Sequence, residues 1–351
     1  MTSSALDTRS LSLEPYWLDT LKTRLPIKKV IPEDIDVLII GGGYTGLSAA
    51  RVTNDLGART AVVDAGLVGN GASNRNGGMF GAHPRVEWSL LSKKFGSEVA
   101  DEIYREALTA QSYVENLIKE ENIDCDLERT GRIQLAWTQA DFDKQKILVS
   151  FLKRHTSIKV SMVPRNQLSS EIKTNRYYGG ILYENHCGIN PAKLHAGFLN
   201  SLNLRDVPII ENTPIISITK ENKGFRVRSK NQELFVPKVI MATNGYTNGD
   251  FSWFKRRVFP LPSYIISTED LPHDLVNELS PRRRLMVETR AQHNYFRVSP
   301  DGNKIIFGGR ASMKAIPLAY AAKRLKSSLD DIWPELRQYG LTNVWTGNTG
   351  F

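Results

Sequence analysis

The sequence predicts a two-part α/β protein in which a parallel, nucleotide-binding sheet is interleaved with an antiparallel sheet. Residues 37–40 form an unbroken aliphatic run that leads through a glycine-rich turn and a helix of small residues to a second aliphatic run, residues 60–63. Such a strand–helix–strand unit is typical of parallel sheets. Farther along, residues 295–299 and 304–307 alternate in polarity and flank a turn in which Gly302 supplies a positive φ. This hairpin indicates an antiparallel sheet.

Length and composition set the broad class. The chain has 351 residues, of which 41% are hydrophobic and 24% charged, as in ordinary globular enzymes of two domains. Its longest segments without a charged residue, 37–50 and 338–351, are each 14 residues long, too short to cross a bilayer. The N-terminus has no signal-peptide pattern. We therefore expect a cytoplasmic protein without a membrane span.

Metal and nucleic-acid sites are not expected. Two cysteines, Cys125 and Cys187, cannot build a four-sulfur site, and the six histidines show no metal-ligand spacing. The net charge is +9, but the basic residues recur as short clusters among acidic neighbours rather than as one arm. Attraction of an anionic cofactor or substrate explains this charge more simply than binding of RNA or DNA.

The turn after the first strand carries a dinucleotide-binding pattern. Gly41 allows a tight turn, Gly43 allows backbone to approach a pyrophosphate, and Gly46 allows the helix to pack closely on the strand. Tyr44 and Thr45 lie between these glycines at the start of the helix. Asp64 ends the second strand, where an acid accepts hydrogen bonds from a ribose 2′-hydroxyl and disfavours a 2′-phosphate. The pattern alone does not choose between FAD and NAD.

The next segment favours FAD. Residues 69–78 read Gly-Asn-Gly-Ala-Ser-Asn-Arg-Asn-Gly-Gly, and backbone of this kind is suited to pass close to a flat ring system. A flexible surface loop is the alternative interpretation. Helices are expected over 97–120, 141–154 and 191–202. On the first of them a stripe is expected to face the core, formed by Val99, Ile103, Ala107, Ala110, Val114 and Leu117.

Together, the run DVLIIGGGYTGLSAA, the acid at position 64 and the segment GNGASNRNGG resemble the FAD-dependent D-amino-acid oxidase and glycine oxidase superfamily. Within it, the γ-glutamylputrescine oxidoreductase group is most similar. The similarity extends through residues 16–17, 242–247, 262–266, 295–302 and 307–310. It implies FAD as the cofactor, a small amine or amino acid as the substrate, and oxygen or another molecule as the electron acceptor.

The resemblance also implies a domain arrangement. A Rossmann-like FAD-binding domain comprises 34–90, 190–247 and 338–351, a substrate domain comprises 91–189 and 248–337, and 1–33 is an irregular lead-in. The implied flavin contacts beyond the first glycine turn are Gly71, Ala72, Ser73, Arg75, Asn76, Gly77, Gly78, Thr243, Asn244 and Gly245. The family continues after Trp345-x-Gly347 into a glycine-rich segment and a helix, whereas this chain ends at Phe351. We interpret the chain as C-terminally truncated, either a fragment or a protein lacking part of its flavin cradle.

The implied reaction transfers a hydride from the carbon that bears nitrogen to flavin N5, and water then hydrolyses the imine. Because the flavin carries the chemistry, no catalytic triad is required. Arg297 and Arg310 are candidates to bind a substrate carboxylate, and Tyr264 and Tyr295 are candidates to wall an amine pocket. Three alternatives stay open: a sarcosine- or glycine-type oxidase, an RNA-modification flavoenzyme module, and a flavin-binding fragment without turnover.

Overall fold

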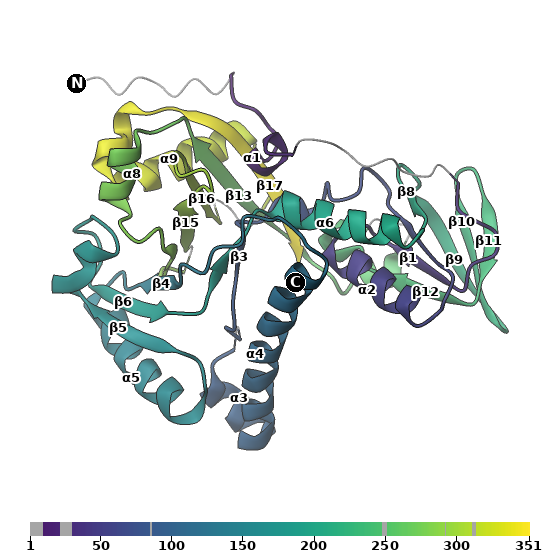
Figure 1. Cartoon of the computed structure of the whole chain (residues 1–351), viewed down its shortest axis with the longest axis horizontal. Coiled ribbons are helices and arrows are strands. Elements are labelled where there is room, and N and C mark those ends of the chain that lie inside the picture. Colours follow the sequence, from purple (N-terminus) through teal and green to yellow (C-terminus); the bar gives the residue numbers. More distant parts are fainter. Residues whose placement is uncertain (1–9, 22–29, 85, 248–250, 292, 311–313) are drawn as a thin grey trace.

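The structure is a computed structural model that describes residues 10–21, 30–84, 86–247, 251–291, 293–310 and 314–351. Parts of the expected lead-in, 1–9 and 22–29, lie outside the described residues; the lead-in also includes one short helix, α1 (Tyr16–Asp19). Within the described residues, no helix is long and apolar enough to cross a membrane. Figure 1 shows the parallel sheet toward one end of the molecule and a large mixed sheet toward the other.

A four-stranded parallel sheet forms the predicted nucleotide-binding part. Its strand order is β12 (Lys238–Met241), β1 (Val37–Ile40), β2 (Thr60–Val63) and β8 (Ile209–Ile210). Because successive side chains point to opposite faces, β1 contributes to two cores. Val37 and Ile39 pack against the helices α2 (Tyr44–Asp55), α4 (Ser97–Glu120) and α6 (Pro191–Leu204). On the other face, Leu38 and Ile40 meet the antiparallel strands β9 (Ile215–Glu221), β10 (Gly224–Ser229) and β11 (Glu233–Val236).

The second sheet has eight strands. Their order is β17 (Leu341–Gly350), β13 (Pro260–Thr268), β16 (Ile305–Gly309), β15 (Asn294–Val298), β14 (Leu285–Glu288), β4 (Arg132–Leu135), β6 (Gly179–Tyr183) and β5 (Val160–Pro164). The predicted hairpin is confirmed: β15 and β16 are antiparallel, and Gly302 in their turn has a φ of +83°. The sheet is not purely antiparallel, because β14 and β4 run parallel.

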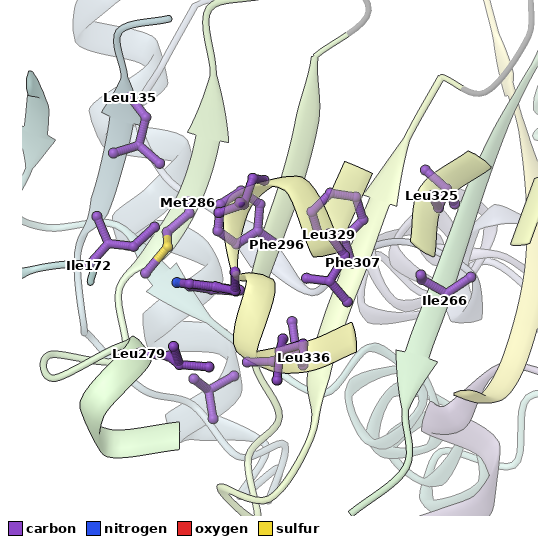
Figure 2. Close-up of a cluster of buried hydrophobic side chains, with 14 of the residues drawn as sticks. Leu135, Ile172, Ile266, Leu279, Met286, Phe296, Phe307, Leu325, Leu329 and Leu336 are labelled. Atoms are coloured by element: carbon purple, nitrogen blue, oxygen red, sulfur yellow. The ribbon is translucent and has the colours of Figure 1, made fainter. Parts of the chain in front are cut away.

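One face of this sheet carries the largest hydrophobic core. Phe296 and Phe307 stack with ring centroids 5.3 Å apart and pack against Leu329. Figure 2 shows these side chains between the strands and the helical segments α8 (His273–Leu279), α9 (Leu318–Ile332) and η4 (Pro334–Gln338). The opposite face is therefore the one left to line a binding site.

Within residues 338–351, the strand β17 belongs to the large sheet rather than to the parallel one. The sequence assigns this segment to the FAD-binding domain, but β17 pairs along the whole of β13. Its end nevertheless contacts η3 (Asn244–Tyr246), where the Gly350 N–H donates to Asn244 Oδ1 at 2.7 Å. The segment thus links the two sheets.

The stripe predicted on α4 is partly wrong. Leu117 is buried, but Val99 and Ala110 are exposed. The buried face of α4 instead comprises Ala100, Tyr104, Gln111, Leu117 and Ile118. The predicted helical period is correct, but the buried face is rotated relative to the predicted stripe. The reason is that α4 contacts two cores: the parallel-sheet core and a second cluster with α3 (Trp88–Phe95) and α5 (Gln139–His155).

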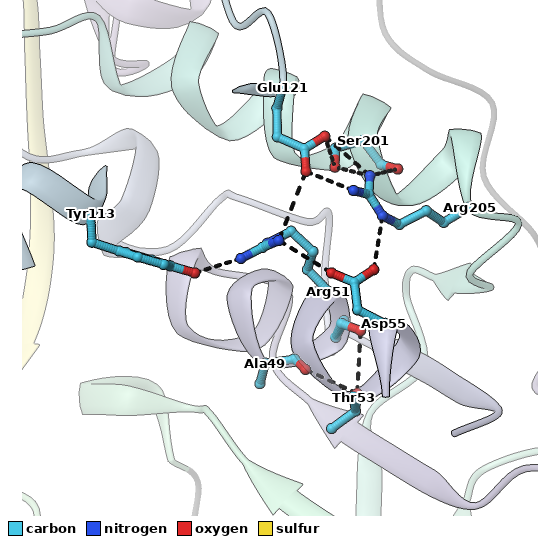
Figure 3. Close-up of polar contacts among 9 residues, drawn as sticks. Ala49, Arg51, Thr53, Asp55, Tyr113, Glu121, Ser201 and Arg205 are labelled. Atoms are coloured by element: carbon cyan, nitrogen blue, oxygen red, sulfur yellow. Dashed lines mark hydrogen bonds and ion pairs between the residues drawn. The ribbon is translucent and has the colours of Figure 1, made fainter. Parts of the chain in front are cut away.

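A polar network joins α2, the end of α4, and α6 (Figure 3). Arg205 donates to both Glu121 oxygens, at 2.7 and 3.1 Å, and Ser201 donates to Glu121 at 2.8 Å. Arg51 of α2 bonds Asp55 at 3.2 Å and the Tyr113 hydroxyl at 2.5 Å. These contacts fix the helices that carry the residues described next. The remaining short elements are η1 (Ala72–Asn74), β3 (Met79–Phe80), η2 (Arg165–Ser170), β7 (Cys187–Gly188) and α7 (Ser252–Lys255).

Candidate active site

The glycine turn between β1 and α2 has the geometry that the sequence predicts. Gly41 has a φ of +110°, and a Cβ there would lie 2.5 Å from the Ala242 carbonyl oxygen. At Gly46 a Cβ would lie 1.8 Å from the Gly41 carbonyl oxygen. Neither position admits a side chain, so the turn and the close helix–strand packing both require glycine.

The N-terminus of α2 is open to an anion. Its first backbone bond runs from the Leu47 N–H to the Gly43 carbonyl oxygen at 2.9 Å, so the amides of Thr45 and Gly46 have no backbone acceptor within the described chain. The preceding amide, that of Tyr44, donates to Ser73 Oγ at 2.9 Å. No acidic residue lies in the first turn. Free amides at a helix N-terminus attract phosphate oxygens.

Asp64 lies beside this turn, at the end of β2. One carboxylate oxygen accepts from the Gly42 N–H at 2.8 Å and the other from the Gly66 N–H at 3.0 Å. Burial is the main reason that the pKa of Asp64 is raised, although both amide bonds act in the opposite direction. Each oxygen keeps a lone pair, so the carboxylate can still accept from a hydroxyl group.

A cavity of about 530 Å³ opens over these groups, and we call it the nucleotide cavity. Eleven of the predicted cofactor residues line it: Gly41, Gly43, Tyr44, Thr45, Asp64, Gly71, Ala72, Ser73, Asn76, Thr243 and Asn244. Gly46, Gly78 and Gly245 are not among its described lining residues. Gly78 instead has a φ of +66°, and Gly245 lies close to Gly350, where a Cβ would meet the amide nitrogen at 3.0 Å.

The segment 69–78, called the flavin loop here, is held by side chains from distant parts of the chain. The indole N–H of Trp17 donates to the Asn76 carbonyl at 2.9 Å, and that of Trp345 donates to the Arg75 carbonyl at 3.1 Å. Within the loop, Arg75 donates to Asn70 at 2.8 Å. The loop is therefore an ordered element and not the flexible surface loop of the alternative interpretation.

Arg297 also holds this loop, which differs from the role the sequence predicts for it. Its Nη1 donates to the carbonyls of Gly78, at 2.7 Å, and Ile189, at 2.9 Å, and Nε donates to Val298. The side chain is buried, and burial lowers its pKa to about 10. These contacts support a structural role rather than the expected grip on a substrate carboxylate, because the guanidinium is already occupied by backbone oxygens.

A second cavity, of about 670 Å³, adjoins the first and is called the substrate cavity. Tyr44, Ala72 and Asn76 line both cavities, so the two are neighbours across the flavin loop. Arg75 and Gly77, which the sequence also predicts as flavin contacts, line the substrate cavity. Its described lining includes three arginines, Arg75, Arg132 and Arg310, and no aspartate or glutamate. Arg75 is paired with Glu14 at 3.1 Å, so Arg132 and Arg310 are the arginines whose charge favours an anionic or carboxylate-bearing ligand.

The two predicted tyrosines lie on opposite sides of the large sheet. Tyr295 lines the substrate cavity and lies across Gly308, where a Cβ would meet its ring at 2.4 Å. Its hydroxyl bonds Ser263 at 2.9 Å, and burial raises its pKa to about 12. Tyr264 packs in the core behind the sheet, and its hydroxyl accepts from the Ile316 N–H at 2.8 Å. Tyr264 therefore does not lie at the wall of the pocket, where the sequence predicts it.

Register explains the difference between the tyrosines. Tyr295 pairs with Gly308, whereas Tyr264 pairs with Gly309, one position farther along β16. Neighbouring positions point to opposite faces of a sheet. Arg310, two residues beyond Gly308, lines the cavity, and its contact with a substrate carboxylate stays a prediction.

A family model described as "DAO: FAD dependent oxidoreductase" matches residues 36–351. The chain belongs to this family. It is an FAD-dependent oxidoreductase of the amine and amino-acid oxidase type.

Individual relatives agree with this membership. The chain of this DAO-family enzyme is 27% identical to the "Probable oxidoreductase OrdL" of Rhizobium meliloti over 95% of its own length and 78% of that protein's. It is 26% identical to the gamma-glutamylputrescine oxidoreductase of Escherichia coli, over 89% and 73% of the two lengths. The crystal structure of glycine oxidase from Geobacillus kaustophilus has the same fold, with a TM-score of 0.73, 17% identity, and coverage of 90% and 82%.

The residues of the DAO-family enzyme fit FAD. The unpaired amides of Thr45 and Gly46 suit a pyrophosphate, and Asp64 suits a ribose hydroxyl. The lining shared by the two cavities allows one extended molecule to occupy both.

Two residues near the cavities were missed by sequence reasoning. His195 of α6 bonds the Gly42 carbonyl through Nε2 at 2.7 Å beneath the glycine turn, and burial lowers its pKa to about 4. Arg132, at the start of β4, lines the substrate cavity. Neither lies in a motif, and only the fold brings them to the site.

Proposed function

We propose that this enzyme oxidises the carbon–nitrogen bond of a small amine that carries a carboxylate, such as γ-glutamylputrescine or a similar compound. The observation that carries the proposal is the pairing of a nucleotide cavity with a substrate cavity that is lined by arginines and by no described acid. When bound, FAD would supply the acceptor for a hydride from the carbon that bears the nitrogen, and oxygen or another molecule would then take up the two electrons.

The chain's own residues bind and orient. Arg310 is proposed to pair with a substrate carboxylate, because a guanidinium binds a carboxylate through two parallel hydrogen bonds. Tyr295 is proposed as a wall of the amine pocket. Burial raises its pKa to about 12, still farther above neutral, so the hydroxyl stays protonated and does not act as a base at neutral pH.

Loss of hydride lets the nitrogen lone pair form a carbon–nitrogen double bond. Water then adds to the carbon, and cleavage of the carbon–nitrogen bond releases a carbonyl compound and the shortened or free amine. This hydrolysis needs no further oxidant.

The test is anaerobic mixing of the FAD-loaded protein with γ-glutamylputrescine, sarcosine, glycine and D-alanine, followed by absorbance near the flavin band. We expect bleaching with the first compound at the lowest concentration. Preferred bleaching by sarcosine or glycine would replace the proposal with the glycine-oxidase alternative. A protein that holds FAD but is bleached by none of these compounds would contradict it.

A further inference from the structure

Unpartnered polar groups gather beside Arg132, one of the residues that line the substrate cavity. Nε and Nη2 of Arg132, the hydroxyl of Tyr183 and Nε2 of His186 are all inaccessible, and none has a hydrogen-bond partner in the described part of the chain. Most buried polar atoms in proteins are hydrogen-bonded, so three such groups together require an explanation.

The three side chains are neighbours. The Arg132 guanidinium carbon lies 4.5 Å from the centroid of the Tyr183 ring, and the Tyr183 and His186 rings are 5.1 Å apart. Tyr183 and His186 are at least nine-tenths buried, whereas Arg132 lines the substrate cavity. We call these three residues the Arg132 cluster.

The charge of the cluster is not compensated. Among the described residues, no carboxylate makes an ion pair with Arg132. Burial is the main cause of the lowered pKa of its side chain. The same burial, with the Arg132 charge as a second cause, lowers the pKa of His186 to about 3, so this imidazole is neutral at physiological pH. Burying a cation without a partner costs free energy, and an anion that binds beside the cation offsets this cost.

The distance between the cluster and Arg310 sets the length of the molecule that can reach both the flavin loop and Arg132. Arg310 follows β16, and Arg132 begins β4, with β15 and β14 between these strands. Three strand spacings correspond to roughly 14 Å across the sheet. Val287 and Tyr295, which pair across the two middle strands, line the cavity between the two arginines. A molecule that reaches from the flavin loop to Arg132 must be elongated.

We propose that the Arg132 cluster is a second, distal anion subsite: it binds the carboxylate of an elongated amine substrate, whereas the carboxylate of a shorter substrate pairs with Arg310. The inference rests on the proposed function, which supplies the amine at the other end. The guanidinium provides the charge and the fork geometry for a carboxylate, while Tyr183 and His186 pack beside it and are not among the described lining residues of the cavity.

Two matched amines test the subsite. N-Succinylputrescine and N-butyrylputrescine share one primary amine and one amide, but only the first ends in a carboxylate. With the wild-type holoenzyme we expect a KM for the succinyl compound lower by a factor on the order of 10 or more, and similar kcat values. Equal KM values for the two compounds would overturn the inference, whereas turnover of both would still support oxidation of a carbon–nitrogen bond.

Variants locate the effect. Arg132→Met is expected to remove the preference for the succinyl compound while KM for the butyryl compound changes little. Arg132→Lys retains charge but not the fork and is expected to restore part of the preference. Tyr183→Phe removes only a hydroxyl, so it tests the cluster even if Arg132→Met does not fold. Retention of the full preference in all three variants would contradict the assignment.

Binding can be measured without turnover. N-Butylsuccinamate has the distal carboxylate but no amine, and isothermal titration should show at least 10-fold weaker binding to Arg132→Met than to wild type, with or without FAD. If neither amine bleaches the flavin, the proposed function fails, yet this titration still decides the subsite. Equal binding to both proteins would reject it.

Discussion

At the scale of single residues, the arginines of this enzyme divide by what they already contact. Arg297 is occupied by two backbone carbonyls, whereas Arg310 and Arg132 line the substrate cavity. In sequence all three are arginines at strand ends or on strands, so residue type alone could not separate them. Burial and bonding partners separate them, and these depend on contacts with segments far along the chain.

Arg297→Lys should therefore weaken FAD binding without changing substrate recognition. Lysine keeps the charge but lacks the planar fork, so the carbonyls of Gly78 and Ile189 lose a fixed donor and the flavin loop loosens. We expect the FAD Kd, measured by fluorescence titration, to rise about 10-fold, in line with the loss of one charged hydrogen bond. In flavin-saturated enzyme the amine KM should stay near that of wild type.

Arg310→Lys is the matched comparison, and it should raise the amine KM while leaving the FAD Kd unchanged. If Arg297→Lys raised the amine KM and left FAD binding intact, Arg297 would be a substrate ligand after all.

At the scale of elements, the strand–helix–strand unit was predictable because its contacts are local. Gly46 and Asp64 contact Gly41 and Gly42 within one short stretch of chain, so their spacing in the sequence predicts their geometry. The large sheet was less predictable. The parallel pairing of β14 with β4 and the position of β17 depend on strands separated by more than 70 residues in sequence. The side of each strand that faces the cavity follows from this register, as the two tyrosines show.

The helices beside the cavities depend on Glu121, which joins the end of α4 to α6. Burial alone would raise its pKa, but hydrogen bonds from Arg205 and Ser201 outweigh burial and lower it. Glu121→Gln removes the charge and leaves Arg205 with a weaker acceptor. We expect the free energy of unfolding to fall by about 1–2 kcal/mol, measured by urea denaturation.

Glu120→Gln provides the control, because Glu120 is the exposed neighbouring residue at the end of α4. Its effect should lie within about 0.5 kcal/mol of zero. Similar losses in both variants would show that the network in Figure 3 contributes little to stability.

At the scale of the whole molecule, part of the net positive charge of +9 is concentrated in the arginines that line the substrate cavity. The sequence predicted attraction of an anionic cofactor or substrate but could not place the charges, since they are dispersed along the chain. Folding gathers Arg75, Arg132 and Arg310, from three distant segments, around one chamber. This convergence is a property of the tertiary structure and has no signature in sequence spacing.

Buried neutral histidines also give the molecule a dependence of stability on pH. Burial lowers the pKa of His195 to about 4 and that of His186 to about 3, whereas an unfolded histidine titrates near 6.5. Below pH 6.5 the unfolded chain therefore binds protons that the folded chain does not. The free energy of unfolding should decrease as pH falls from about 6.5 toward 4, and above 6.5 these histidines should contribute no slope.

The contribution of His195 can be isolated with His195→Gln. Between pH 7.5 and pH 5 the wild type should lose roughly 1–2 kcal/mol more than this variant, as measured by urea denaturation at each pH. His273→Gln is the control, since His273 is exposed on α8 and its ring meets water in both states. Because His195 supports the Gly42 carbonyl, FAD affinity in His195→Gln should also fall. An identical pH dependence in wild type and His195→Gln would mean that the imidazole is not held neutral beneath the glycine turn.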